Sequence, residues 1–597
     1  MNDLYAEFEG IISDKLQKVT EKFFNPPAHP TLKNFSNSTH THKKFFSKLQ
    51  KFQDKLASLK FLDPACGSGN FLTETYLSLR RLENEVLKQV MGAEIKLGDL
   101  DNPIKVSINQ FYGIEINDFA VSVAKTALWI AESQMMTETS EIVHKDLDFL
   151  PLKTSATIVE ANALTMDWHT VAPQANYIMG NPPFVGKSYQ TKTQKTEMAN
   201  IFDGIKGYGN LDYVTCWYKK AADFIQNTHI KCAFVSTNSI CQGIAVPPLW
   251  NYLFNNGVVI NFAYRTFKWQ SESTDMAQVH CIIVGFSMID TPKIIFDGDK
   301  IIEAQNINAY LLDAPNIIVE PRNKPLFDVP PMYVGVMPCD NGNFILSEIE
   351  RAELVKKYPA AEKFIHPYMG SEDFINDKQR FCLWLKDSSP AEIKKISPIY
   401  ERVKNVRDFR LKSTSDANRK LAATPTLYAR SNFIDAPKLL IPMLSSSSRN
   451  YIPIGFIDSK IVVSNLASFI PNGDIFLFGI LTSRVLMTWL KTVGSRFKTD
   501  YRFSASIVYN TFPFCQPTDK QRKKIEQTAQ SILDARNLYP DSSLADLYDE
   551  RTMPPKLRRA HQLNDRAVMD AYGFDHSMTE SEIVAELMKL YKKLTNI

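Results

Sequence analysis

The sequence predicts an α/β protein built around a doubly wound sheet that a β-hairpin closes. Short apolar runs of strand length recur between residues 60 and 296, and amphipathic helical stretches separate the first of them. Several of these runs end in polar or glycine-containing turns, where strands leave a sheet. An α+β region and a charged helical segment follow this alternating part.

Chain length and local sequence composition predict five segments. With 597 residues, 44% of them hydrophobic, the chain is long enough to build several cores. We expect a helical segment at 1–57, the doubly wound domain at 58–300, a proline-rich linker at 301–329, an α+β domain at 330–516 and a helical region at 517–597.

Charge is distributed unevenly along the chain. The formal net charge is only +4, but residues 401–515 contain 16 Lys and Arg against 7 Asp and Glu. A local basic excess with interleaved aromatic residues suits a polyanion such as nucleic acid. A solvated surface is the plain alternative.

The cysteines and the apolar stretches bear on the location of the protein. The eight cysteines are scattered, without a C-x-x-C pair or Cys/His spacing, so no metal site is predicted. They fit the reduced thiols of a cytoplasmic protein. The N-terminus lacks the apolar core of a signal peptide, and the apolar run 475–490 contains Arg484, so we expect no membrane segment.

The first expected element is a strand, a glycine turn and a helix. Residues 60–63 form the strand, and a long amphipathic stretch to about residue 90 follows the turn. Gly67 and Gly69 would let the backbone approach a ligand closely. This is the layout in which an adenosine-bearing cofactor lies across strand ends. The glycines fit neither the dinucleotide G-x-G-x-x-G pattern nor a P-loop.

The next two expected strands end in polar side chains. The run 111–117 carries Glu115, and a carboxylate at the end of a second strand can accept both hydroxyls of a ribose. The run 157–160 leads to Asn162, which is placed to meet the edge of an adenine ring. A surface carboxylate and a turn Asn are the alternatives.

The fourth expected strand, 177–180, ends in the tetrapeptide Asn-Pro-Pro-Phe at 181–184. The prolines fix φ and disfavour the continuation of a strand or a helix, so a stiff, sharply turned loop is expected. Such a loop presents an Asn amide and backbone carbonyls in fixed directions beside an aromatic ring, which suits a planar amino group. The remaining expected elements are a polar loop at 187–208 and strands at 230–236, 258–264, 278–287 and 293–296.

Three motifs together resemble a known family. Residues 63–71 (DPACGSGNF), 113–117 (GIEIN) and 181–184 (NPPF) resemble, in this order, a gamma-class S-adenosylmethionine-dependent amino-methyltransferase of DNA. Longer stretches resemble the methylase and target-recognition part of MmeI-like and YeeA-like restriction-modification enzymes. The resemblance covers residues 58–515 and implies a Rossmann-like methyltransferase sheet followed by a target-recognition domain.

The resemblance implies a binding site for S-adenosylmethionine. Asp63 and the loop after it would hold the methionine part of the cofactor, Glu115 would take the ribose hydroxyls, and Ile116 would pack on the adenine. Asn162 stands where relatives often have an Asp that contacts the adenine amino group. The expected cofactor-binding residues are Asp63, Ala65, Cys66, Gly67, Gly69, Asn70, Phe71, Glu115, Ile116 and Asn162.

The resemblance likewise implies the residues that act on the target base. Asn181 and the Pro182 carbonyl would accept hydrogen bonds from the target amine, and Phe184 would stack on its ring. The expected catalytic residues are Asn181, Pro182, Pro183 and Phe184. A second aromatic residue, Phe267 or Trp269, is a candidate for holding the base, with core packing as the alternative.

The chemistry agrees with these residue types. The exocyclic amine of adenine is a weak nucleophile, because its lone pair is delocalised into the ring. Two acceptors on its hydrogens favour a pyramidal nitrogen, so positioning supplies most of the gain and no strong base is needed. The amine is out of reach inside a duplex, so the base is expected to flip into the pocket.

Two departures from the family bear on the expected activity. Bifunctional relatives carry an N-terminal nuclease domain with an Asp…Glu-x-Lys site and a further upstream cofactor segment, and nothing in residues 1–57 matches either. We therefore expect methylation without cleavage. The missing segment is expected to come from a separate N-terminal or nuclease polypeptide of the same system, or to be lost from a truncated product.

The leading hypothesis is an adenine-specific DNA methyltransferase that acts on double-stranded DNA. It would be the modification component of a restriction-modification or phage-defence system. Two alternatives stay open: a catalytically weak DNA-specificity subunit that needs a partner, and a methyltransferase that acts on RNA or on a protein glutamine.

Overall fold

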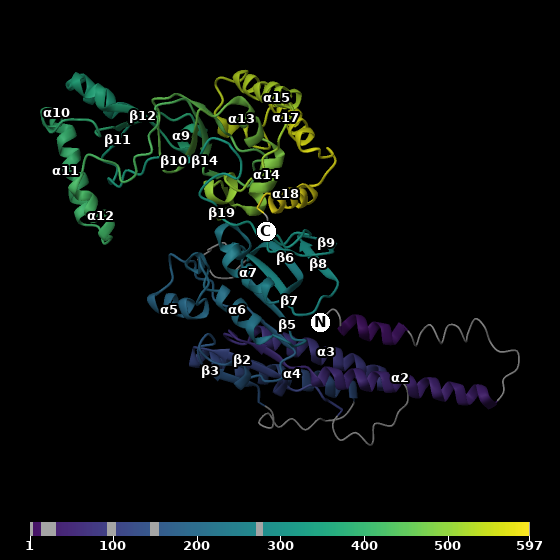
Figure 1. The fold of residues 1–597 in the computed structure, drawn as a ribbon. Coiled ribbons are helices and arrows are strands. Elements are labelled where there is room, and N and C mark those ends of the chain that lie inside the picture. Colours follow the sequence, from purple (N-terminus) through teal and green to yellow (C-terminus); the bar gives the residue numbers. More distant parts are fainter. Residues whose placement is uncertain (1–3, 14–31, 92–102, 144–154, 270–278, 596–597) are drawn as a thin grey trace. The chain divides into compact units, whose positions relative to one another are not determined.

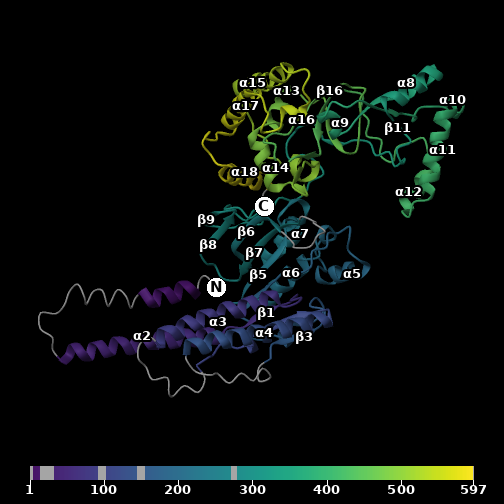
Figure 2. The ribbon, with the colours of Figure 1, turned by 180° about the vertical axis from the view of Figure 1, so that it is seen from behind.

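The computed structural model describes two compact units of the chain (Figures 1 and 2). Unit 1 comprises residues 1–240 and 251–304, and unit 2 comprises residues 241–250 and 305–597. The described residues are 4–13, 32–91, 103–143, 155–269 and 279–595. The predicted division into five segments is finer than these two units and stays a prediction.

Unit 1 is built on a nine-stranded mixed sheet with the order β3-β2-β1-β4-β5-β7-β6-β8-β9. Strands β1 to β5 are parallel to one another, and β7 runs antiparallel to both β5 and β6. The strands are β1 (Phe61–Asp63), β2 (Phe111–Glu115), β3 (Thr157–Glu160), β4 (Tyr177–Gly180), β5 (Lys231–Thr237), β6 (Val259–Trp269), β7 (Val279–Ser287), β8 (Lys293–Asp297) and β9 (Lys300–Ala304). The sheet confirms the predicted α/β fold. Strand β6 is longer than predicted, and β9 was not predicted.

The strand order reverses between β1 and β4. The chain proceeds outward from β1 to β2 and β3 on one side, and from β4 to β5 on the other. In open α/β sheets a ligand crevice lies outside the carboxyl ends of the strands at such a switch point. The loops after β1 and β4 therefore occupy the expected position of a binding site.

The described part of unit 1 contains six α-helices, besides a helical stretch at residues 4–13. They are α2 (Leu32–Ser58), α3 (Asn70–Met91), α4 (Asp118–Val143), α5 (Lys192–Ile201), α6 (Thr215–Phe224) and α7 (Val246–Asn255), which crosses into unit 2. The prediction of a loop throughout 187–208 is wrong, because α5 lies within it. A capping box between Thr191 and Gln194 starts this helix.

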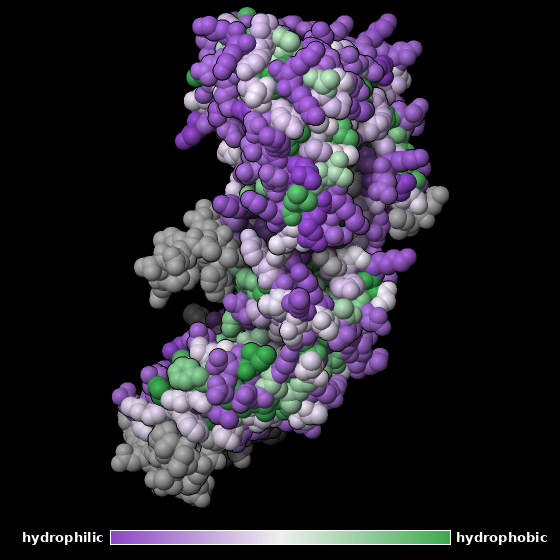
Figure 3. Space-filling view, turned by 90° about the vertical axis from the view of Figure 1, so that its left-hand side faces the viewer, coloured by the Kyte–Doolittle hydropathy of each residue, from purple (hydrophilic) through white to green (hydrophobic). Residues whose placement is uncertain are grey.

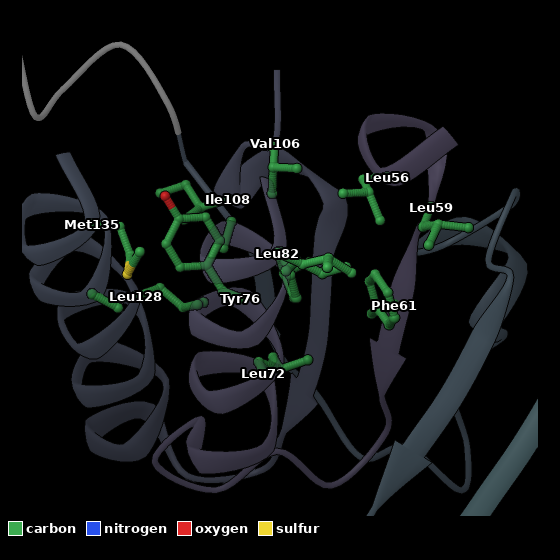
Figure 4. Packing of buried hydrophobic residues seen from close by; sticks show 14 of the residues in the cluster. Leu56, Leu59, Phe61, Leu72, Tyr76, Leu82, Val106, Ile108, Leu128 and Met135 are labelled. Atoms are coloured by element: carbon green, nitrogen blue, oxygen red, sulfur yellow. The ribbon is translucent and has the colours of Figure 1, made fainter. Parts of the chain in front are cut away.

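The central strands are buried on both faces. Phe61 stacks on Phe111 and Tyr177 of the neighbouring strands, each at a ring-centroid distance of 5.3 Å. Figure 4 shows Phe61 among apolar side chains of α2, α3 and α4. On the opposite face Tyr218 of α6 packs against Phe234 of β5 at 5.5 Å. Helices on both faces make this a doubly wound sheet.

Unit 2 contains three smaller sheets, which are antiparallel except where β12 pairs with β17. The first is β10 (Tyr333–Val334), β18 (Ala467–Pro471), β14 (Lys438–Pro442) and β16 (Gly455–Ile457). The second is β11 (Ile345–Leu346), β13 (Arg380–Leu383), β12 (Ile365–Met369) and β17 (Val462–Val463). The third is β15 (Leu444–Ser445), β20 (Asp500–Arg502) and β19 (Ser495–Phe497). These sheets confirm the predicted α+β character.

The helices of unit 2 fall into two groups. Those among the sheets are α8 (Glu348–Lys357), α9 (Ser371–Ile375), α10 (Pro390–Lys395), α11 (Ser397–Leu411) and α12 (Asp416–Lys420). Those after them are α13 (Ile475–Leu481), α14 (Arg484–Val493), α15 (Asp519–Asn537), α16 (Leu544–Leu547), α17 (Pro555–Tyr572) and α18 (Glu580–Thr595). The last four confirm the predicted C-terminal helical segment. The surface of unit 2 is mainly hydrophilic in the upper part of Figure 3.

Helices α13 and α14 hold the most apolar run of the sequence. They meet at 54°, and most of their side chains are buried within unit 2. Among the described residues no single helix is both long and apolar enough to cross a membrane, and only this bent pair meets those criteria jointly.

A buried guanidinium organises the loops around α11. The side chain of Arg410 is fully buried and donates five hydrogen bonds of 2.7–3.0 Å to backbone carbonyls. The acceptors belong to Pro338, Cys339, Leu421, Thr424 and Leu427. A cation counted in the basic excess of the sequence is therefore used inside the fold.

We expect Arg410→Ala to lower the free energy of unfolding of unit 2 by about 3 kcal/mol, because buried carbonyls lose their donors. Thermal or denaturant unfolding measures the change. Arg407→Ala, an exposed change on the same helix, serves as the control and is expected to stay within about 0.5 kcal/mol. Equal effects of the two substitutions would contradict the role of Arg410.

Candidate functional site

The loop after β1 is shaped by its carboxylate and its glycines. Asp63 is 1% exposed, and its Oδ1 accepts a hydrogen bond of 3.0 Å from the Ala65 amide. Gly67 and Gly69 have φ values of +53° and +82°, which favour glycine. A Cβ on Gly69 would lie 2.9 Å from that of Ala124 in α4, whereas the space beside Gly67 is open. Gly69 thus serves packing, and Gly67 leaves room for a ligand.

The remaining predicted residues of this loop differ in the burial of their side chains. Cys66 is buried, its sulfur lies against Gly113, and burial raises the pKa of its thiol. Only the backbone of Cys66 is therefore suited to contact a ligand. Asn70 and Phe71 begin α3 with exposed side chains.

Glu115 links the loops after β1 and β2. Its Oε2 accepts the Gly67 amide at 2.9 Å, and its Oε1 accepts the amides of Ile116 and Asn117 at 2.9 and 3.0 Å. Each carboxylate oxygen has about two acceptor sites, so Oε2 keeps capacity for a ligand hydroxyl. Ile116 and Phe119 stand beside it, 69% and 74% exposed, and offer an apolar surface to a ring. Phe119 was not predicted from the sequence, although an aromatic residue directly after the GIEIN motif was an available signal.

Asn162 makes its hydrogen bonds within the protein. Its Nδ2 donates to Glu197 of α5 at 2.6 Å, and its Oδ1 accepts the Leu164 amide at 2.9 Å. Glu197 in turn accepts the Tyr213 hydroxyl at 2.5 Å. This chain of bonds ties α5 to the loop after β3. The adenine contact of Asn162 stays a prediction.

Asp63 lies against Gly180, the residue just before the tetrapeptide. A Cβ on Gly180 would stand 2.5 Å from Asp63 Oδ1, so only glycine fits there without displacing the carboxyl group. Sequence reasoning missed Gly180, and its lack of a side chain just before the Asn-Pro-Pro-Phe motif was the available signal. The end of β1 and the residue that precedes the tetrapeptide are thus packed directly against each other.

Asn181 has a buried acceptor without a partner. Its Oδ1 is buried and accepts no hydrogen bond from any described residue. Pro182 is buried, Pro183 is exposed, and Phe184 is partly exposed. Native proteins leave few buried polar atoms unpaired, so such an atom points to a ligand that completes it.

Asp212 holds the tetrapeptide loop in place. Its Oδ1 accepts the amides of Val185 and Val214 at 2.9 and 3.2 Å, and its Oδ2 accepts the Thr237 hydroxyl at 3.3 Å. Burial raises the pKa of Asp212, and these hydrogen bonds oppose the rise. Gln190 adds a bond of 3.0 Å to the Val185 carbonyl. A buried acid just before a helix was the signal that sequence reasoning overlooked.

Trp217 ties the same region to the loop after β1. Its indole Nε1 donates to the Pro64 carbonyl at 3.0 Å. Since Asp212 stands just before α6 and Trp217 lies in its first turn, the start of one helix anchors both loops.

Of the two predicted aromatic residues of β6, the structure describes the side chain of Phe267 only. Phe267 pairs with Cys281 of β7, which pairs with Thr237 of β5 on its other side. Phe267 is partly exposed and therefore lies at the same edge as the end of β5. The side chain of Trp269 lies outside the part that the structure describes. Roles of both in base binding stay predictions.

Electrostatics at this edge favour a cationic ligand. Burial raises the pKa of Asp63 to about 7, the Ala65 amide opposes the rise, and the nearby Glu115 adds to it. A cation placed beside these two carboxyl groups would favour their ionised forms. Within the described residues no cluster of three or more His, Cys, Asp or Glu side chains is arranged to hold a metal ion.

Comparison with known proteins identifies the class. Residues 36–297 match the family described as MmeI, DNA-methyltransferase domain. Residues 313–516 match the MmeI target recognition domain, and residues 517–597 match the MmeI C-terminal domain. The sheet and its edge loops are therefore those of a DNA-methyltransferase domain.

Individual relatives agree with this class. DNA methyltransferase A of Bacillus subtilis (strain 168) is 40% identical over 557 residues, which are 92% of this chain and 63% of that protein. The structure of the type IIL restriction-modification enzyme MmeI in complex with DNA has 41% identity and a TM-score of 0.88, and the match covers 98% of this chain and 78% of that one. The adenine-specific methyltransferase PglX of Streptomyces coelicolor (strain ATCC BAA-471 / A3(2) / M145) is 34% identical over 74 residues, 12% of this chain and 5% of that protein.

The chain belongs to the MmeI family. The resemblance to MmeI-like methyltransferases that the three motifs predict is confirmed. The chain spans 63% of the length of the Bacillus subtilis relative.

The close approach of Gly180 to Asp63 gives a testable expectation. Gly180→Ala should lower the free energy of unfolding of unit 1 by about 1–3 kcal/mol, because the added methyl group overlaps the buried carboxyl. Gly186→Ala is the matched control, since its Cβ would meet nothing closer than 4.0 Å. Thermal unfolding of both variants measures the difference, and a neutral Gly180→Ala would refute the proposed constraint.

Proposed function

We propose that this chain transfers a methyl group from S-adenosylmethionine to the N6 amine of an adenine in double-stranded DNA. The observation that carries the proposal is the buried, unpartnered Oδ1 of Asn181 at the switch point of the sheet. An acceptor in that position suits a donor on the ligand, and the exocyclic amine of adenine is such a donor.

The residues after β1 and β2 suit the cofactor. Open space beside Gly67 allows the ligand to approach the backbone, and exposed Ile116 and Phe119 suit the face of an adenine ring. Glu115 retains acceptor capacity for a ribose hydroxyl, and Asp63 supplies a carboxyl group for the cationic methionine part. When bound, S-adenosylmethionine supplies an electrophilic methyl group.

The chain's own residues act mainly by positioning. Asn181 Oδ1 and the Pro182 carbonyl accept hydrogen bonds from the two hydrogens of the amine, and Phe184 stacks on the base. These two hydrogen bonds would favour a pyramidal nitrogen whose lone pair forms the bond to the methyl carbon, while the bond from that carbon to the cofactor sulfur breaks and leaves a neutral thioether. The nitrogen then loses one proton to water, so no strong base is required. Asp212 keeps the loop rigid by holding the Val185 amide.

The family supports DNA as the substrate and adenine as the target base. Residues 313–516 match a target recognition domain, and the related MmeI structure is a complex with DNA. One relative is described as an adenine-specific methyltransferase. Because Asn181 Oδ1 is buried, a base paired inside a duplex would not reach it, so the adenine would be flipped out of the duplex. The modification component of a restriction-modification or phage-defence system is the role we infer.

Exposed cations of unit 2 are the candidates for phosphate contacts. Arg410 and Lys438 are buried and bonded to carbonyls, so they are excluded. Among the exposed cations of residues 401–515, six have side chains that make no hydrogen bond or ion pair with any described residue: Arg407, Lys412, Arg430, Lys460, Lys498 and Arg502. Phosphate contacts of this kind would make DNA affinity fall steeply with salt.

Methyl transfer from labelled S-adenosylmethionine to genomic DNA of varied origin tests the activity. We expect Asn181→Ala to lower the rate about 10²- to 10³-fold, the range found when one positioned hydrogen-bonding group is removed from an active site. Asn256→Ala is the matched control, because the Asn256 amide donates to the Tyr252 carbonyl on the exposed end of α7. Wild-type protein that methylates no DNA would overturn the proposed function.

The protonation of Asp63 gives a pH dependence of cofactor affinity. Burial raises its pKa to about 7, so the group is neutral below that pH and negatively charged above it. The dissociation constant for the cationic cofactor should therefore fall as the pH rises from about 5.5 to about 7.5, by up to about tenfold per unit below the pKa. Isothermal titration calorimetry measures this change.

Two variants show whether Asp63 is responsible. Asp63→Asn should bind the cofactor more weakly and without this pH dependence. Asp299→Asn, in the exposed turn between β8 and β9, should leave the wild-type profile intact. A wild-type affinity that stays flat from about pH 5.5 to about 7.5 would refute the assignment.

A further inference from the structure

Asn238 follows the strand that lies next to the strand carrying the catalytic motif. Gly180 of β4 is paired with Phe234 of β5, and the two strands are parallel. Asn181 follows Gly180 directly, and Asn238 is the first residue after the end of β5. Since parallel strands present their carboxyl ends at one edge, both asparagines lie at the same edge of the sheet.

Hydrogen bonds fix the two loops to each other. Thr237, next to Asn238, donates its hydroxyl to Asp212 Oδ2 at 3.3 Å. Val185, next to Phe184, donates its amide to Asp212 Oδ1 at 2.9 Å. A single carboxylate therefore holds the residue before Asn238 and the residue after the catalytic motif.

The two asparagines carry complementary unpaired atoms. Asn181 has a buried Oδ1 without a donor, and Asn238 has a buried Nδ2 without an acceptor among the described residues. A buried amide atom that lacks a partner costs stability, so few remain in a native fold unless a ligand completes them. One acceptor and one donor at the same edge match a ligand that offers a donor beside an acceptor.

We propose, resting on the proposed function, that Asn238 is a specificity-determining residue whose Nδ2 donates to the ring nitrogen N1 of the flipped adenine. Asn181 Oδ1 accepts from the neighbouring N6 amine, so the two amides together contact the Watson–Crick edge. Guanine and thymine present a carbonyl and a ring N–H in the corresponding positions. Asn181 Oδ1 would then face a carbonyl oxygen and Asn238 Nδ2 would face an N–H group, so neither hydrogen bond would form. The pair thus selects amino bases over keto bases, while cytosine, which shares the pattern, is separated by ring size.

Substrate analogues test the contact without altering the protein. The target adenine is first located by sequencing methylated DNA, and oligonucleotides then carry 1-deazaadenine or 7-deazaadenine at that position. We expect kcat/KM of the wild-type protein to fall about tenfold with 1-deazaadenine, the loss typical of one hydrogen bond. With 7-deazaadenine, which keeps N1, kcat/KM should stay within about twofold. Equal values for adenine and 1-deazaadenine would overturn the proposal.

The variant Asn238→Ala assigns the effect to this residue. It should lower kcat/KM on adenine about tenfold and show no further loss on 1-deazaadenine, because both changes remove the same hydrogen bond. Its thermal unfolding midpoint should not fall, since the removed Nδ2 has no partner among the described residues. Asn256→Ala should keep the wild-type response to both analogues.

The outcomes separate the two proposals. Two results would overturn the role of Asn238 alone. One is a kcat/KM on 1-deazaadenine that Asn238→Ala lowers further, so that the two losses multiply, and the other is a drop in the unfolding midpoint of the variant. Wild-type protein that transfers no methyl group to any DNA would overturn both this role and the proposed function.

Discussion

The carboxylate of Asp212 is the interaction on which the arrangement of the site depends. It joins the Val185 amide, the Val214 amide and the Thr237 hydroxyl, and it does so from a buried position. Trp217 adds the bond to Pro64 from the same helix start. The loops after β1, β4 and β5 are therefore held by one rigid element. Only such rigidity allows a buried amide oxygen to stay aimed at a ligand instead of turning to an internal donor.

Local signals allowed much of the sheet and part of the site to be predicted. Strands β1 and β4 are apolar runs that end at a glycine turn and at two prolines, and these residues restrict the backbone wherever they occur. The bonds of Asp212 had no such signal, because its partners at Val185 and Thr237 are 27 and 25 residues away. Partners at that separation are set by the packing of strands, which no short stretch of sequence encodes.

Three features of the structure were not predicted from the sequence, and each has a physical cause. Helix α5 is mostly polar, so composition indicated a loop, and only its capping box marked the start of a helix. The hydrogen bond of Asn162 to Glu197 was not predicted, because Glu197 lies 35 residues later in the sequence, and the adenine contact of Asn162 stays a prediction. Arg410 was counted with the exposed cations, because a charge count carries no information about burial.

The contact between Gly180 and Asp63 limits how the unit can diverge. Because Gly180, the last residue of β4, has no side chain that would displace the Asp63 carboxyl group, the two halves of the candidate site fit closely against each other. A change of side chain on either half must be matched by the other. Recombination between relatives with a breakpoint between residues 63 and 180 would combine two packed segments that evolved in different proteins. The two loops should therefore be inherited, and exchanged in engineered chimeras, as one block.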